Sequence, residues 1–326
     1  MSRRILITGG YGYIGGRVAQ ALVAGGAHVL LGTRRDGSVS PVWLPQAAPL
    51  QMDWSSGAAL LAACTGVDAV VHLAALNEVE AVRDPQGALD VNGMWSLRLL
   101  EAAQAAGAGR FVYLSTAHVY GAPLRGTIDE SCLPRPVHPY AITHRVAEDF
   151  VLAARDAGKI EGVVLRLSNG FGAPAHAGVD RWTLLVNDLC RQAVNTHTLV
   201  LHSAGLQKRD FITLNDVARG VVHALGLADE ALGDGLFNLG GDASLRVIDM
   251  AELIAARCGA ILGFVPEISR PKAKSGEAGA ELVFSSEKFK LTGWTPGKGH
   301  AGEIDATLTL CQQIASKSSV SVSSRM

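Results

Sequence analysis

The chain has 326 residues, of which 48% are hydrophobic and 18% are charged, and its formal net charge is −1 at pH 7. This composition allows a large buried core and excludes extensive disorder away from the chain ends. The chain has no excess of basic residues of the kind that nucleic-acid-binding proteins carry. We therefore expect no nucleic-acid partner, and phosphate binding only at a local site.

The N-terminus and the cysteines predict a cytoplasmic protein. Residues Met1–Arg4 lead directly into a strand-like run, without the apolar stretch and cleavage site of a signal peptide. No segment approaches 18 continuous apolar residues, which disfavours a membrane span. The five cysteines are scattered, odd in number and without CxxC spacing, so we expect reduced thiols and no bound metal.

The first half of the chain alternates short apolar runs with helical stretches. The predicted strands are Arg4–Thr8, His28–Gly32, Ala69–Leu73, Arg110–Ser115 and Gly162–Leu167. The predicted helices between them are Gly12–Val23, Gln86–Ala106 and Tyr140–Ala157. Near-continuous apolar strands separated by helices are typical of a doubly wound parallel sheet, which makes this an α/β chain.

The second half has a different pattern, in which glycine and proline cluster between shorter elements. The predicted helices are Trp182–Ala193, Leu214–Leu227 and Ser244–Cys258, and the predicted strands are Thr198–Leu201 and Leu236–Leu239. We expect a first domain over residues 1–168 and a smaller mixed α/β domain over 169–315, interleaved with the last strands of the sheet. The serine-rich segment 316–326 is predicted to be a disordered tail.

A glycine-rich segment follows the first predicted strand and opens the first predicted helix. Its glycines Gly9, Gly12 and Gly15 allow a tight turn and close approach of a pyrophosphate, while Tyr13 and Ile14 begin a helix with free N–H groups. An isolated glycine triplet is also found in ordinary tight turns. Here it stands between a strand and a helix, as dinucleotide binding in a Rossmann-type fold requires.

The glycine spacing is GxxGxxG, which resembles the extended short-chain dehydrogenases/reductases, and especially their nucleotide-sugar epimerases and dehydratases. Further segments resemble motifs of this family in the same order along the chain. They are Val71–Ala75, Asp90–Gly93, Leu114–Gly121, Leu165–Gly172 and Arg209–Ile212. The resemblance covers most of the chain, and several motifs in order are more specific than any one of them.

The resemblance implies which residues contact the cofactor outside the glycine-rich segment. Asp53 matches the carboxylate that meets the adenine amino group, and Asn92 matches an asparagine carried on a helix. The remaining matches lie at the ends of two strands, at Leu73, Ala74, Ala75 and Ser115. The resemblance also implies a homodimer joined by a four-helix bundle, which the helices Gln86–Ala106 and Tyr140–Ala157 would supply.

The end of the second strand favours NADP over NAD. An NAD enzyme usually has an acidic residue there for the ribose hydroxyls, whereas this chain has Thr33 followed by Arg34 and Arg35. A guanidinium can bind a 2′-phosphate and stack on adenine. Two other readings remain open: a solvated basic turn, or NAD binding in which Asp36 reaches the ribose.

Tyr140 and His144 stand where the family has Tyr-x-x-x-Lys, and Thr116 stands where it has the hydroxyl that contacts the tyrosine. The resemblance implies that Tyr140 is the acid/base for a sugar hydroxyl and that His144 takes the lysine's place at the nicotinamide ribose. Positions i and i+4 share one helix face, but an imidazole is largely neutral near pH 7. Each residue also has an alternative role outside catalysis. Tyr140 could be a packing residue, His144 could be a surface substitution in an enzyme that works in another way, and Thr116 could cap the end of a strand.

The substrate side is implied by matching single residues. Asn169 matches a residue that binds the sugar nucleotide, and Arg209 matches one that binds the substrate pyrophosphate. For Arg209 the alternative is a salt bridge to the neighbouring Asp210. His118 is a further candidate, because Ala117 and His118 replace the Asp-Glu pair of the dTDP-glucose 4,6-dehydratases, which disfavours that activity. The segment Ala173–Thr183 is where the family reads the sugar.

The sequence leaves three functions open. The motif set favours an epimerase that acts on a nucleotide-diphosphate sugar through a transient 4-keto sugar. The arginine pair favours an NADPH-dependent 4-keto-sugar reductase, because a consumed reductant is commonly NADPH. The loss of the usual lysine keeps a non-catalytic nucleotide-binding protein as the third reading.

Overall fold

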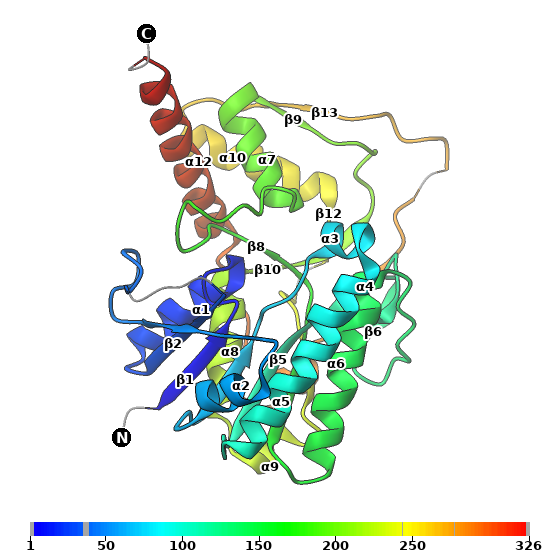
Figure 1. Cartoon of the computed structure of the whole chain (residues 1–326). Helices are drawn as coiled ribbons and strands as arrows, with labels where there is room; N and C mark the ends of the chain where they lie inside the picture. Colours follow the sequence, from blue (N-terminus) through cyan, green and yellow to red (C-terminus); the bar gives the residue numbers. More distant parts are fainter. Residues whose placement is uncertain (1–2, 35–38, 243, 277, 324–326) are drawn as a thin grey trace.

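The computed structural model describes residues 3–34, 39–242, 244–276 and 278–323. Its centre is a seven-stranded parallel sheet with the order β11-β7-β5-β4-β1-β2-β3 (Figure 1). The strands are β1 (Arg4–Thr8), β2 (His28–Thr33), β3 (Ala48–Gln51), β4 (Ala69–His72), β5 (Arg110–Thr116), β7 (Glu161–Leu167) and β11 (Leu236–Leu239). The order reverses beside β1, as in a doubly wound sheet, and the predicted fold class is confirmed.

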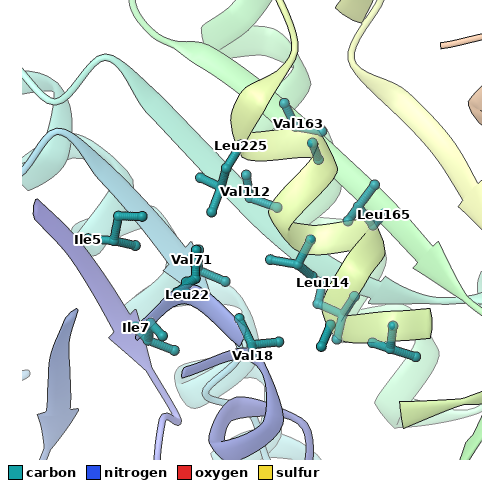
Figure 2. Close-up of a cluster of buried hydrophobic side chains, with 14 of the residues drawn as sticks. Ile5, Ile7, Val18, Leu22, Val71, Val112, Leu114, Val163, Leu165 and Leu225 are labelled. Carbon is teal, nitrogen blue, oxygen red and sulfur yellow. The ribbon is translucent and has the colours of Figure 1, made fainter. Parts of the chain in front are cut away.

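Two layers of helices cover the sheet because the strand residues alternate between its faces. On one face, Ile5 and Ile7 pack with residues of α1 (Tyr13–Ala24) and α8 (Leu214–Gly226), in the cluster that Figure 2 shows. On the other face, Leu6 packs with residues of three helices. These are α2 (Gly57–Cys64), α5 (Trp95–Ala105) and α6 (Pro139–Asp156).

The predicted helix Gln86–Ala106 is three consecutive pieces. A short helix α4 (Pro85–Ala88) is followed by a π-helical turn (Leu89–Met94) and then by α5. The wider turn carries Asn92, and a π-helical turn inside a helix often marks a functional site.

A second cluster of helices lies beyond one end of the sheet. Helices α7 (Leu185–Thr196), α10 (Val247–Ile261) and α12 (His300–Ser323) enclose a separate apolar core. A three-stranded sheet links this cluster to the main sheet (Figure 1). Its strands are β8 (Asn169–Phe171), β10 (Lys208–Thr213) and β12 (Ser244–Arg246).

The remaining elements are short. Two pairs of strands are β9 (Thr198–Val200) with β13 (Glu267–Ser269), and β6 (Gly126–Ile128) with β14 (Leu282–Phe284). The short helices are α3 (Glu78–Arg83), a 3₁₀ turn (Ala117–Tyr120), α9 (Asp229–Leu232) and α11 (Glu287–Lys290). Within the described part of the chain, no helix combines the length and apolarity needed to cross a membrane.

The structure differs from the sequence prediction near the C-terminus. Helix α12 runs from His300 to Ser323 and so extends into the segment 316–326, for which the disordered tail stays a prediction. The first turns of α12 are held by the buried side chains Ile304 and Leu308 of the second core, and propagation from a formed helix costs little. In addition, Ser244–Arg246 pairs as a strand, so α10 begins later than predicted.

Candidate active site

The glycine-rich segment forms a narrow turn at the end of β1. Gly9 has φ +68°, and the Gly12 N–H donates to the Gly9 carbonyl at 2.8 Å. A Cβ on Gly15 would stand 2.1 Å from that same carbonyl oxygen, so a side chain does not fit there. The first turn of α1 has no side-chain cap, which leaves its N–H groups free for an anion. This cradle fits the pyrophosphate of a dinucleotide.

The segment after β4 lies directly against this turn. A Cβ on Gly9 would stand 2.9 Å from the Ala74 backbone nitrogen, and the Thr8 hydroxyl accepts from the N–H groups of Leu73 (3.3 Å) and Ala74 (3.4 Å). The structure thus brings Leu73, Ala74 and the neighbouring Ala75 beside the glycine-rich turn.

Asn92 holds this segment through its side-chain amide. Its oxygen accepts from the Leu76 N–H at 2.7 Å, while its nitrogen donates to the Leu76 carbonyl at 3.3 Å and the Thr143 hydroxyl at 3.0 Å. Asn92 is 1% exposed. The amide therefore ties the segment after β4 to helix α6, and in this way positions the backbone that faces the cofactor cradle.

The first residues of α1 have different surroundings. Tyr13 is buried, and its hydroxyl donates to the Gly172 carbonyl at 2.9 Å and contacts Asn187. Its side chain thus joins α1 to the second helical cluster. Both Tyr13 and Ile14 line the large cavity that is described below.

The adenine side of the predicted cofactor site is only partly described. Arg34 is exposed just after β2, whereas Arg35 and Asp36 lie outside the described residues. Asp53 is exposed. It lies near the end of β2, because the N–H of the neighbouring Met52 donates to the Thr33 carbonyl. Hydrogen bonds from the Ser55 hydroxyl (2.6 Å) and N–H (2.9 Å) lower the pKa of Asp53 and keep it an anionic acceptor.

A cavity of about 630 Å³ lies at the carboxyl end of the sheet, between the two helical clusters. Thr116 and Tyr140 both line it. Burial, together with the nearby Glu78 carboxylate, raises the pKa of Tyr140 to about 12, while Arg181 and a hydrogen bond with Thr116 act in the opposite direction. The structure thus joins the two predicted catalytic hydroxyls.

His144 lies one helical turn after Tyr140, and the two rings meet edge to face with their centroids 4.4 Å apart. The imidazole is 3% exposed, and its Nδ1 lies 2.6 Å from the Tyr113 hydroxyl. Its Nε2 has no hydrogen-bond partner among the residues that the structure describes. Burial lowers the pKa of His144 to about 3, so the ring is neutral at physiological pH.

Ser115 lines the cavity, and its hydroxyl is bonded to a buried ion pair. Its hydroxyl donates to Glu148 Oε1 at 2.5 Å, and the other oxygen of Glu148 accepts from Arg166 Nη2 at 2.7 Å. Both charged side chains are at most 1% exposed. One face of α6 carries Tyr140, His144 and Glu148 at intervals of four residues. The ion pair of Glu148 with Arg166 therefore fixes this face of the helix against β7.

The predicted substrate residues line the same cavity as Tyr140. Asn169 Nδ2 donates to the Asp210 carbonyl at 2.9 Å, and Arg209 Nη2 donates to Gln207 Oε1 at 3.4 Å. The Asp210 carboxylate accepts from the Ser168 hydroxyl and the Gly241 N–H. Desolvation and the Arg209 guanidinium lower the pKa of His118, which lies at the cavity wall.

The sequence analysis did not identify two charged residues of this cavity, Glu78 and Arg181, as site residues. It included Arg181 only as part of the segment Ala173–Thr183, where the family recognises the sugar. Glu78 begins α3 after the capping residue Asn77, and Arg181 lies in the loop before α7. Arg181 Nη2 is 3.2 Å from Glu78 Oε2, so the pair bridges the two helical clusters across the cavity. The capping box of Asn77 and Glu80 indicates that a helix starts here. No local signal shows that the first residue of that helix, Glu78, lies near Tyr140.

Comparisons with known proteins agree with this geometry. Residues 5–240 match the NAD dependent epimerase/dehydratase family. The chain is 31% identical over 303 residues to dTDP-6-deoxy-L-talose 4-dehydrogenase (NAD(P)(+)) of Kitasatospora kifunensis, which covers 90% of this chain and 91% of the relative. It is 29% identical over 321 residues to UDP-glucose 4-epimerase of Streptomyces lividans, which covers 91% and 93%.

Among solved structures, UDP-glucuronic acid 4-epimerase from Bacillus cereus in complex with NAD has a TM-score of 0.77 to this chain at 25% identity. The match covers 95% of this chain and 96% of that chain. The predicted resemblance to the extended short-chain dehydrogenases/reductases is therefore confirmed, and the chain belongs to the NAD dependent epimerase/dehydratase family.

Proposed function

We propose that the chain is an NAD(P)-dependent epimerase of a nucleotide-diphosphate sugar, acting through a transient 4-keto sugar. The observation that carries the proposal is the shared cavity, in which Thr116 and Tyr140 face Asn169 and Arg209. The glycine-rich cradle fits a dinucleotide, and so does the Nε2 of His144, which has no hydrogen-bond partner within the described part of the chain. The relatives named as UDP-glucose 4-epimerase and UDP-glucuronic acid 4-epimerase support the same reaction.

The residues of the cavity account for the proton chemistry of this reaction. In its ionised form Tyr140, hydrogen-bonded to Thr116, takes the proton of the sugar hydroxyl as a carbonyl forms and becomes a neutral phenol, which returns the proton when the hydroxyl re-forms. When bound, the nicotinamide supplies the acceptor and donor of hydride. Arg209 and Asn169 hold the nucleotide-diphosphate part, so that the 4-keto sugar can turn while bound and receive hydride on the opposite face of C4. Predicted roles for Asp53, Leu73, Ala74, Ala75 and Asn92 at the cofactor stay proposals.

A net reductase is the second candidate, because Thr33 ends β2 where an acid would favour NAD and Arg34 follows it, and because one relative is named as a 4-dehydrogenase that uses NAD(P)(+). Incubation with UDP-, GDP-, CDP- and dTDP-sugars, with products and NADPH absorbance followed together, separates the readings. We expect an epimeric sugar without net consumption of NADPH. Stoichiometric consumption would replace the epimerase by the reductase, and neither product nor consumption would leave a non-catalytic protein.

Cofactor preference provides a first prediction. We propose that NADPH binds more tightly than NADH and that Arg34→Ala weakens only the NADPH complex, by about 10-fold or more, because one charge-assisted contact to the 2′-phosphate is lost. Titration of cofactor fluorescence measures both affinities in the same variant. Equal or tighter binding of NADH by the unmodified protein would assign Asp36, rather than the arginines, to the ribose.

The substrate pyrophosphate provides a second prediction. Arg209→Ala is expected to raise the KM for the sugar nucleotide by about 10- to 100-fold while the affinity for the cofactor is unchanged, because a charge-assisted contact is removed. Arg246→Ala on the neighbouring strand β12 is the matched control, since Arg246 is already paired with Asp249. An unchanged KM in Arg209→Ala would reduce this residue to a structural role.

Dimer formation provides a third prediction. Four large apolar side chains on the π-helical turn and on α6 are 41% to 49% exposed, namely Leu89, Met94, Ile142 and Phe150. Exposed apolar side chains gathered on two helices are typical of a protein interface. We propose a homodimer through these helices and expect sedimentation equilibrium to give twice the chain mass, and Phe150→Glu to give the monomer. The cytoplasmic location stays a prediction.

A further inference from the structure

Tyr113 on β5 is joined to His144 on α6 by a hydrogen bond of 2.6 Å. No local pattern in the sequence predicts this contact. Tyr113 is 2% exposed and His144 is 3% exposed, so water does not compete for this contact. The other titratable groups around the imidazole are Tyr140 on its own helix and His72 on β4, whose own ring nitrogens are bonded to Thr8 and Ser96.

Counting donors and acceptors determines which nitrogen of His144 carries the proton. If the Tyr113 O–H donates to Nδ1, the proton of the neutral ring is on Nε2, and only that N–H lacks a partner. If Nδ1–H donates to the Tyr113 oxygen instead, both the phenol proton and the Nε2 lone pair lack partners among the described residues. Buried polar groups are rarely left unsatisfied, so the first arrangement is the favoured one.

The protonation states agree with this arrangement. Burial, with Glu148 and Tyr140 nearby, raises the pKa of Tyr113 well above 10, so its hydroxyl keeps a proton to donate. Burial lowers the pKa of His144 to about 3, so Nδ1 keeps a lone pair to accept it. The result is a buried Nε2–H donor one turn from Tyr140, with no acceptor among the described protein atoms.

We propose that Tyr113 is a positioning residue, which holds His144 as a neutral imidazole whose Nε2–H donates to a hydroxyl of the nicotinamide ribose. The inference rests on the proposed function, since the ribose comes with the dinucleotide. A lysine ammonium at this position would bring three donors and a positive charge, whereas the imidazole brings a single directed donor and no charge. The direction of that donor then depends on a residue of another element, 31 positions earlier in the chain.

Nuclear magnetic resonance of protein labelled with ¹⁵N-histidine tests the tautomer directly, with His144 assigned by its loss in His144→Gln. We expect Nε2 to carry the proton and Nδ1 to be unprotonated throughout pH 6–8, and the Nε2–H resonance to shift when NADP or NAD is added. Tyr113→Phe is expected to allow both tautomers and to weaken cofactor binding by about 3- to 30-fold. Tyr120→Phe is the matched control, because it removes a different phenol hydrogen bond, to Asn238.

Three results would overturn the proposal: a proton on Nδ1, an imidazolium at pH 7, or equal cofactor affinities for Tyr113→Phe and Tyr120→Phe. If Tyr113→Phe does not fold, the spectra of the unmodified protein with and without cofactor still decide, since an Nε2–H resonance that does not respond to the cofactor refutes the contact. Failure of the proposed function is distinct from these results. It would appear as dinucleotide binding without turnover of any sugar nucleotide, while the tautomer and its response to the cofactor stand.

Discussion

Tyr140→Phe is expected to lower the turnover number by a factor of about 10² to 10⁴, the usual contribution of a positioned acid/base group. The substitution removes only the hydroxyl group, so the ring still packs edge to face against His144. We therefore expect the affinity for the cofactor to stay within a few fold of that of the unmodified protein. Steady-state kinetics and cofactor titration measure the two quantities separately.

The pH dependence of turnover follows from the same group. Because burial and Glu78 raise the pKa of Tyr140 to about 12, the phenol is almost wholly protonated near pH 7, and the rate is expected to rise with pH below that pKa. The neutral His144 supplies no positive charge to offset this. His144→Lys places an ammonium one turn away, and an opposite charge at that range lowers a pKa by about 1–3 units. The rising limb should move to lower pH accordingly.

Two outcomes would contradict this account of Tyr140. Full activity of Tyr140→Phe would mean that another group transfers the proton, and His118, which also lines the cavity, would be examined first. A rising limb that stays in place in His144→Lys, in a variant that binds cofactor normally, would show that the charge at position 144 does not act on Tyr140.

Arg166→Met is expected to lower the free energy of unfolding by about 3–5 kcal/mol, because it removes the buried and closer of the two cationic partners of the Glu148 carboxylate. The Arg166 side chain is 1% exposed and that of Glu148 is not exposed. The remaining partners, Ser115 and the partly exposed Arg145 at 3.5 Å, cannot offset the lost guanidinium, whose Nε and Nη2 both donate to Glu148. Urea unfolding followed by circular dichroism measures the change, provided that the slope with denaturant is unaltered.

Arg191→Met is the control for this effect, because it makes the same chemical change in an exposed pair. Arg191 and Asp188 lie 2.8 Å apart on α7, with side chains 45% and 32% exposed. Solvent screening limits such a pair to less than about 1 kcal/mol. Equal losses in Arg166→Met and Arg191→Met would show that the buried pair adds nothing beyond a surface contact. A large loss in Arg166→Met alone would show that the buried pair stabilises the packing of α6, the helix that carries Tyr140.

The sequence by itself determined the features that depend on neighbours along the chain. Apolar runs predicted five strands of the parallel sheet to within one residue at each end, because burial on both faces of a sheet requires such runs. The spacing of Gly9, Gly12 and Gly15 predicted the turn between β1 and α1, where a side chain would collide with backbone. The interval of four residues placed Tyr140 and His144 on one face of a helix.

Only the tertiary structure decided the contacts that join distant segments. The pairing of Tyr113 with His144 spans 31 positions, that of Arg181 with Glu78 spans 103, and β11 reaches the main sheet from the second half of the chain. Local periodicity carries no information on such pairs, because burial pattern shows that a residue is covered but not by what. For that reason the sequence could name His144 as unusual, whereas only the folded chain shows it buried, uncharged and hydrogen-bonded to Tyr113.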